Sequence, residues 1–111
     1  MLGSLYEGQD CSAARTLELV GERWSLLILR DAMFSGHTRF SQFQKSLGVA
    51  TNILAKRLDG FVAAELMVAV GAPARYRLTQ KGHELKPVID ALAEWGDKWV
   101  GPRPVKLGRS G

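Results

Sequence analysis

Four basic side chains gather in the middle of the chain without an acidic neighbour. Residues 36–58 contain neither Asp nor Glu, and they carry four cations, Arg39, Lys45, Lys56 and Arg57. Cations grouped in this way attract phosphate oxygens, which nucleic acids present in rows. The chemistry indicated by this stretch is therefore ion pairing with an anionic polymer.

Two short amphipathic helices are expected to position these charges. Apolar residues recur at spacings of three and four on both sides of Gly48: Phe40, Phe43 and Leu47 before it, and Leu54, Leu58 and Phe61 or Val62 after it. The link at Gly48 is a tight turn, where glycine readily takes a positive φ. This arrangement is typical of a helix-turn-helix, whose second helix can enter a DNA major groove. An ordinary αα-hairpin with a solvated basic face fits the spacing and charge equally well.

Two further helices are predicted before this pair. The first spans 13–20, with Ser12 as its N-cap and Gly21 as its stop. The second spans 24–34 and is the most hydrophobic. Its central core residues are expected to be Trp24, Leu27, Ile28 and Phe34, with Arg30 and Asp31 on the far side. Thr38 is then the predicted cap of the helix that begins at Arg39.

The pattern changes after Leu66. Residues 67–70 and 75–78 read as two short strands around a turn at 71–73, because the second alternates basic and apolar residues. A hairpin at this place can form a DNA-contacting wing, or it can be purely structural. Thr79 is expected to cap one last helix, with Pro87 inside its early turns.

The last helix carries a narrow apolar seam with spacings of three, four, three and four. The seam residues are Leu85, Val88, Leu92, Trp95 and Trp99. A seam of this width is typical of helices that pair with a partner helix, so dimerisation is favoured over packing onto the first helix through Leu17.

The order of these elements, and several motifs within them, resemble the HxlR-type winged helix-turn-helix transcriptional regulators of bacteria. The resemblance runs from Cys11 to Trp99. It is carried by the motifs ARTLELVGERWSLLILRD, RFSQFQKSLGVATNILAKRL, YRLTQKG and ALAEWGDKW, in the family's order.

The resemblance implies a homodimer that binds double-stranded DNA at a pseudo-palindromic operator, more often as a repressor, without enzymatic activity or cofactor. The helix from Ala50 would be the recognition helix, and the first and last helices would form the dimer interface. The implied DNA-binding residues are Thr38, Arg39, Thr51, Asn52, Lys56, Arg57 and Arg75. Arg39 and Arg57 are expected in phosphate contacts or helix-positioning contacts.

Two departures from the family pattern stand near the recognition helix. The usual glycine after it is Glu65 here, so the left-handed stop is expected to be made otherwise. The wing, VAVGAPARYRL, is short and lacks the arginines often found at its start, which weakens the prediction of wing contacts to DNA.

Cys11 is the only cysteine. It matches a cysteine that senses oxidants or electrophiles in some members of the family, which makes it a redox-sensing candidate. Sensing needs an exposed thiol of low pKa. A buried, unreactive thiol is nevertheless the favoured interpretation, since free cysteines are among the most buried residues.

No catalytic constellation or metal site is apparent, because His37 and His83 each lack a second ligand at a suitable spacing. The hydrophobic fraction of 46% and charged fraction of 23% are ordinary for a globular protein. A net charge of +4 favours an anionic partner. Without an apolar run of membrane length or a signal-peptide pattern, a cytoplasmic protein is expected, with no membrane partner.

The predicted fold class is mostly α with a small β-hairpin (α+β), a winged helix-turn-helix that dimerises through its first and last helices. The expected divisions are a flexible arm at 1–10, the DNA-binding and dimerisation domain at 11–100, and a disordered tail at 101–111. The alternative function is a winged-helix protein-interaction module that uses the Trp95 and Trp99 face. A receptor with an unknown small-molecule or oxidant signal also remains open.

Overall fold

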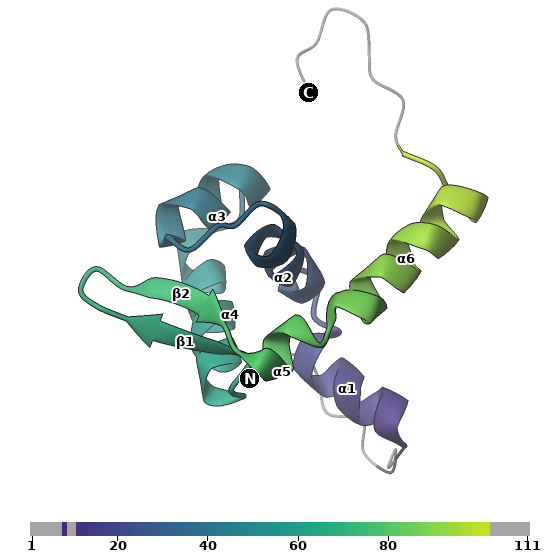
Figure 1. The fold of residues 1–111 in the computed structure, drawn as a ribbon, viewed down its shortest axis with the longest axis horizontal. Helices are drawn as coiled ribbons and strands as arrows, with labels where there is room; N and C mark the ends of the chain where they lie inside the picture. Colours follow the sequence, from purple (N-terminus) through teal and green to yellow (C-terminus); the bar gives the residue numbers. More distant parts are fainter. Residues whose placement is uncertain (1–7, 9–10, 103–111) are drawn as a thin grey trace, which may run out of the picture.

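The computed structural model describes residue 8 and residues 11–102, so most of the arm and tail predicted from the sequence lies outside the described residues. Figure 1 shows a helical body with a hairpin projecting from one side and two helices, α1 and α6, projecting from the other. In chain order the elements are α1 (Ser12–Val20), α2 (Ser25–Phe34), α3 (Phe40–Leu47), α4 (Thr51–Ala63), β1 (Met67–Val70), β2 (Arg75–Leu78), α5 (Gln80–His83) and α6 (Lys86–Trp99). The predicted architecture, mostly α with one β-hairpin, is confirmed.

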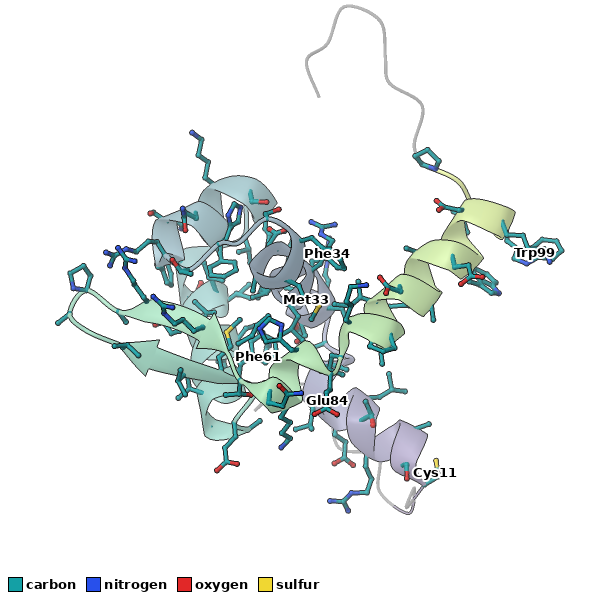
Figure 2. The ribbon with its side chains drawn as sticks, in the orientation of Figure 1. Cys11, Met33, Phe34, Phe61, Glu84 and Trp99 are labelled. Atoms are coloured by element: carbon teal, nitrogen blue, oxygen red, sulfur yellow. The ribbon has the colours of Figure 1, made fainter. Side chains whose placement is uncertain are left out.

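The core lies where α2, α3 and α4 meet. Its fully buried apolar side chains are Ile28, Leu29, Phe43, Leu54, Leu58 and Phe61. Phe61 is labelled inside the body in Figure 2. The apolar spacings of three and four that predict α3 and α4 therefore meet in one core. Their opposite faces are left for solvent or a ligand.

The predicted core face of α2 is partly wrong. Ile28 is buried as expected, but Phe34 is 53% exposed and Asp31 is only 3% exposed. The Asp31 carboxylate accepts hydrogen bonds from the Ser46 hydroxyl, at 2.7 Å, and from the guanidinium of Arg30. These partners make burial of a charge tolerable, and the bond from Ser46 joins α3 to α2.

The hairpin has the predicted bounds and is tied to the start of α3. Its strands are antiparallel, with Met67 opposite Leu78 and Val70 opposite Arg75. The other edge of β2 meets residues 38 and 39. The Tyr76 N–H donates to the Thr38 carbonyl at 2.8 Å, and Arg39 forms a β-bridge with Arg75. The hairpin is therefore held at a definite place beside the two central helices.

The segment after the hairpin stops α4. Glu65 takes a left-handed φ of 62°, so the expectation that this stop is made by another residue is wrong. The Thr79 hydroxyl donates to the Glu65 carbonyl at 2.6 Å, and the Lys81 ammonium donates to the Ala64 carbonyl at 2.9 Å. These bonds satisfy carbonyls that the end of α4 leaves without helical donors, which offsets the strain of the positive φ.

The predicted single last helix is two helices. Thr79 caps α5, as expected, but the chain breaks at Glu84 and Leu85 before α6 begins. Pro87 stands in the first turn of α6, a position where its missing N–H costs no helical hydrogen bond. Ile89 is the buried residue of α6, and the rest of the helix extends away from the body (Figure 1).

Two predicted caps also differ in detail. Cys11, one residue before the expected Ser12, is the N-cap of α1. At α3, Arg39 takes the N-cap position rather than Thr38. The Gln42 side chain accepts hydrogen bonds from the backbone N–H groups of both residues, at 2.9 and 3.0 Å.

Candidate nucleic-acid interface

The outer face of α4 is polar and exposed. Thr51, Asn52 and Lys56 are all exposed at its surface. The opposite face of α4 is fully buried, at Leu54, Leu58 and Phe61. Because the apolar face is anchored in the core, the helix presents its polar residues outward on a fixed support.

The turn between α3 and α4 orients the start of α4. Gly48 takes a φ of 65°, as expected of the tight turn, and Val49 is buried. The Gln44 side chain of α3 donates to the Thr51 hydroxyl at 2.6 Å. This bond occupies one lone pair of that hydroxyl and leaves its proton available for a ligand. Gln44 is absent from the residues predicted for this site, because nothing in the local spacing links it to Thr51.

Arg57 lies apart from the outer face of α4. Its Nε atom stands 2.8 Å from a carboxylate oxygen of Glu22, and the two side chains are only 12% and 23% exposed. Arg57, one of the predicted DNA-binding residues, therefore forms an ion pair within the chain that joins α4 to residue 22. Glu22 is a partner that the sequence reasoning missed, since 35 positions separate the two residues.

Thr38 and Arg39 lie where α3 meets the hairpin. Both are half-buried, and Thr38 offers its carbonyl to the hairpin as described above. The guanidinium of Arg39 donates to the Pro73 carbonyl at 3.1 Å, in the turn between the strands. Arg39 therefore holds the tip of the hairpin, and this hydrogen bond uses only one of its five donors.

The solvent face of the hairpin carries two arginines. Arg75 and Arg77 are both exposed and stand two residues apart on β2, so they share one face. Val68 and Val70 of β1 lie opposite them in the strand register. Arg77 was not among the predicted site residues, although the alternation of basic and apolar residues places it beside Arg75.

Comparison with known proteins identifies the family of the chain. The HxlR-like helix-turn-helix family model matches residues 19–104, most of the chain. The chain belongs to the HxlR-like helix-turn-helix family.

Several proteins named as HTH-type transcriptional regulators are similar to this chain in sequence. The HTH-type transcriptional regulator Rv3095 of Mycobacterium tuberculosis is 44% identical over 93% of this chain, which spans 66% of its length. The HTH-type transcriptional regulator YdeP of Bacillus subtilis is 31% identical, with 88% of this chain and 83% of that protein covered. The family is therefore one of transcriptional regulators.

Solved structures share the fold. The crystal structure of PA1607 aligns with a TM-score of 0.79 and 43% identity, covering 97% of this chain and 75% of that chain. Quinone-bound YodB of B. subtilis aligns with a TM-score of 0.70 and 26% identity, covering 81% of this chain and 100% of that chain.

In this HxlR-like chain the predicted seam of the last helix is largely uncovered. Trp95 and Trp99 are 62% and 66% exposed, and Trp99 points away from the body (Figure 2). Val88 and Leu92 are exposed as well, whereas Leu85 is half-buried against the core. An apolar groove on α6 is lined by Pro87, Val88, Ala91, Leu92 and Trp95. Packing among residues 11–102 therefore leaves most of the seam exposed.

Cys11 is exposed, so the favoured prediction of a buried thiol is wrong. Its sulfur accepts a hydrogen bond from the Ala14 N–H at 3.5 Å, as the N-cap of α1.

The described part of the chain holds neither a cluster of metal ligands nor a membrane-spanning helix. No group of three or more His, Cys, Asp or Glu is placed there to hold a metal ion. The His37 ring packs edge-on against Phe43, with 5.8 Å between ring centroids, so its role is structural. No helix among the described residues is long and apolar enough to span a membrane.

Proposed function

We propose that this protein is a cytoplasmic transcriptional regulator that binds duplex DNA as a homodimer and represses from a pseudo-palindromic operator. The observation that carries the proposal is the outer face of α4, where Thr51, Asn52 and Lys56 reach solvent on a helix anchored by its buried apolar face. A helix held in this way after a tight turn has the geometry of a major-groove reader.

The residues of this surface divide into two roles. Asn52 carries an amide, which can pair in two hydrogen bonds with adenine, and Thr51 can contact a base or a phosphate. Lys56, Arg75 and Arg77 are cations at the surface of α4 and of the hairpin, and they are assigned to phosphates. Phosphate contacts supply most of the affinity, whereas contacts to base edges supply specificity.

The dimer is supported by exposed apolar residues on two helices that project from the same side of the body. Leu17 of α1 is 46% exposed, and the α6 seam is exposed from Val88 to Trp99. We assign these surfaces to an isologous interface, in which each patch meets its symmetry mate. The two copies of α4 would then read half-sites about 10 bp apart, or a multiple of that distance.

The first test is binding of the purified protein to its own upstream DNA, with random DNA as competitor, over a salt series. We expect binding that resists competitor and falls steeply with salt, because each neutralised phosphate contributes a slope of about −0.9. Weak binding that is equal on both DNAs would refute the proposal. The Trp95 and Trp99 face would then be the place to seek a protein partner.

Two substitutions on α4 separate the roles. Lys56→Ala should weaken binding to operator and random DNA alike and reduce the salt slope by about 1. Asn52→Ala should cost roughly 1–3 kcal/mol on the operator with little effect on random DNA. Equal losses on both DNAs for Asn52→Ala would refute its base-reading role.

A redox or electrophile signal through Cys11 is a second element of the proposal. It is supported by the exposure of the thiol at the start of α1, a helix assigned to the dimer interface. Oxidant or quinone should change operator binding of the wild type and leave Cys11→Ser unaffected. An equal response of both proteins would exclude Cys11 as the sensor.

A further inference from the structure

The ion pair between Glu22 and Arg57 connects the turn after α1, a helix assigned to the proposed dimer interface, with α4, which is assigned to DNA recognition. Glu22 lies in the turn that joins α1 to α2, and Arg57 lies on α4. One carboxylate oxygen of Glu22 stands 2.8 Å from Arg57 Nε and also accepts the Trp24 N–H at 3.2 Å. Both side chains are mostly buried, so water screens the pair less than it screens a surface ion pair.

The turn that carries Glu22 is itself tightly held. The Gly21 N–H donates to the Leu17 carbonyl at 2.7 Å, and a Cβ on Gly21 would stand 2.5 Å from that oxygen. On the other side, the Ser25 N–H donates to the Glu22 carbonyl at 3.0 Å. The close approach at Gly21 fixes the direction of α1 relative to the turn. The Glu22 side chain, which is anchored in that turn, therefore links the orientation of α4 to the orientation of α1 as well as to that of α2.

We propose that Glu22 is a positioning residue for DNA recognition. Through Arg57 it sets the angle between α4 and α1, and so the separation of the two α4 helices in a dimer that uses α1. This inference rests on the proposed function. Its consequence is that Glu22 matters for binding two half-sites at once and matters little for binding one.

A charge change at residue 22 should alter DNA-binding affinity in opposite directions, depending on whether the residue acts only through its charge or by positioning α4. Replacing an acidic residue by a basic one raises the attraction between a protein and DNA, so Glu22→Lys should tighten binding if the residue has no other role. If Glu22 positions α4, the same substitution sets an ammonium group against the Arg57 guanidinium and should weaken binding to the full operator. The sign of the change therefore decides between the two.

The experiment measures the DNA-binding affinity of wild type, Glu22→Lys and Glu84→Lys. Two duplexes are used, one with the full operator and one with a single half-site. Glu84 is an exposed carboxylate at the end of α5, far along the chain from the turn, and provides the matched charge change. We expect Glu22→Lys to lower the affinity for the full operator roughly tenfold or more, which is in the range of coupling energies between contacting residues. The affinity of Glu22→Lys for the half-site should be unchanged or higher. The affinity of Glu84→Lys should not fall on either duplex.

A charge exchange completes the test. Glu22→Lys combined with Arg57→Glu restores an ion pair and should recover most of the full-operator affinity. If Arg57 acts instead by contacting phosphate, the double variant stays weak on both duplexes and its salt slope falls by about 1, which would overturn the inference. Should Glu22→Lys fail to fold, Glu22→Gln gives the same comparison with a smaller expected loss on the full operator.

The outcomes separate this inference from the function on which it rests. A wild type that does not prefer its operator would refute the proposed function. A wild type that binds its operator, together with a Glu22→Lys variant that binds the full operator as well or better, would refute only the positioning role of Glu22.

Discussion

Gly82 is the residue at which the structure makes its sharpest prediction about stability. It is buried in α5, and a Cβ added there would stand 2.2 Å from the Leu66 carbonyl oxygen and 3.1 Å from Leu78 Cδ2. The first contact is with backbone, which cannot rotate away as a side chain would. Gly82→Ala must therefore push α5 away from the end of α4.

The size of the effect follows from what that movement disturbs. Overpacking of a filled site costs about 1–3 kcal/mol. Loss of the 3.0 Å hydrogen bond from the Thr79 N–H to the Leu66 carbonyl adds about 0.5–1.5 kcal/mol. The lower backbone entropy of alanine in the unfolded chain returns about 0.5–1 kcal/mol. The expected net loss is about 1–3 kcal/mol.

Urea and thermal unfolding followed by circular dichroism, at one fixed protein concentration, measure this loss. We expect Tm to fall by roughly 5–20 °C. The matched control is Gly96→Ala in α6, where an added Cβ meets nothing within 4 Å and which should gain about 0.5–1 kcal/mol. A Gly82→Ala variant as stable as wild type would refute the packing of α5 against residue 66.

Two further predictions concern association and the α2–α3 junction. Trp95→Ala should raise the dissociation constant of the proposed dimer 10²- to 10⁴-fold in sedimentation, since roughly 1.5–3 kcal/mol per tryptophan is lost in both subunits. The control is Val68→Ala, at an exposed apolar site on the hairpin, which should leave association unchanged. Ser46→Ala removes a donor from the buried Asp31 carboxylate and should cost about 1–3 kcal/mol in urea unfolding, with a loss under about 0.5 kcal/mol contradicting the role of that hydrogen bond.

Much of the fold could be predicted from local patterns. Strand β2 has the expected bounds because the alternation of basic and apolar residues that predicts it is a property of neighbouring residues. The exposed face of α4 was predicted for a similar reason. The spacing of Leu54, Leu58 and Phe61 indicates which side of the helix is buried, and so which side is left exposed.

The predictions fail where a residue's contacts come from residues distant in the sequence. Asp31 was expected at the surface, but Ser46 on another helix makes its burial tolerable. Glu65 adopts a conformation unusual for its type because Thr79 and Lys81 hold the adjacent carbonyls. The TQKG motif contains these partners, yet the sequence alone does not reveal which carbonyls they meet.

The sequence by itself determined the element types, the turn at Gly48 and the basic, acid-free stretch, since each depends on residues within a few positions of one another. Only the tertiary structure decided which of the cations face outward. Lys56 and Arg57 are adjacent in sequence, and successive residues on a helix point about 100° apart. Lys56 therefore remains at the surface, while Arg57 turns inward to meet Glu22, a carboxylate that the fold brings from 35 positions away.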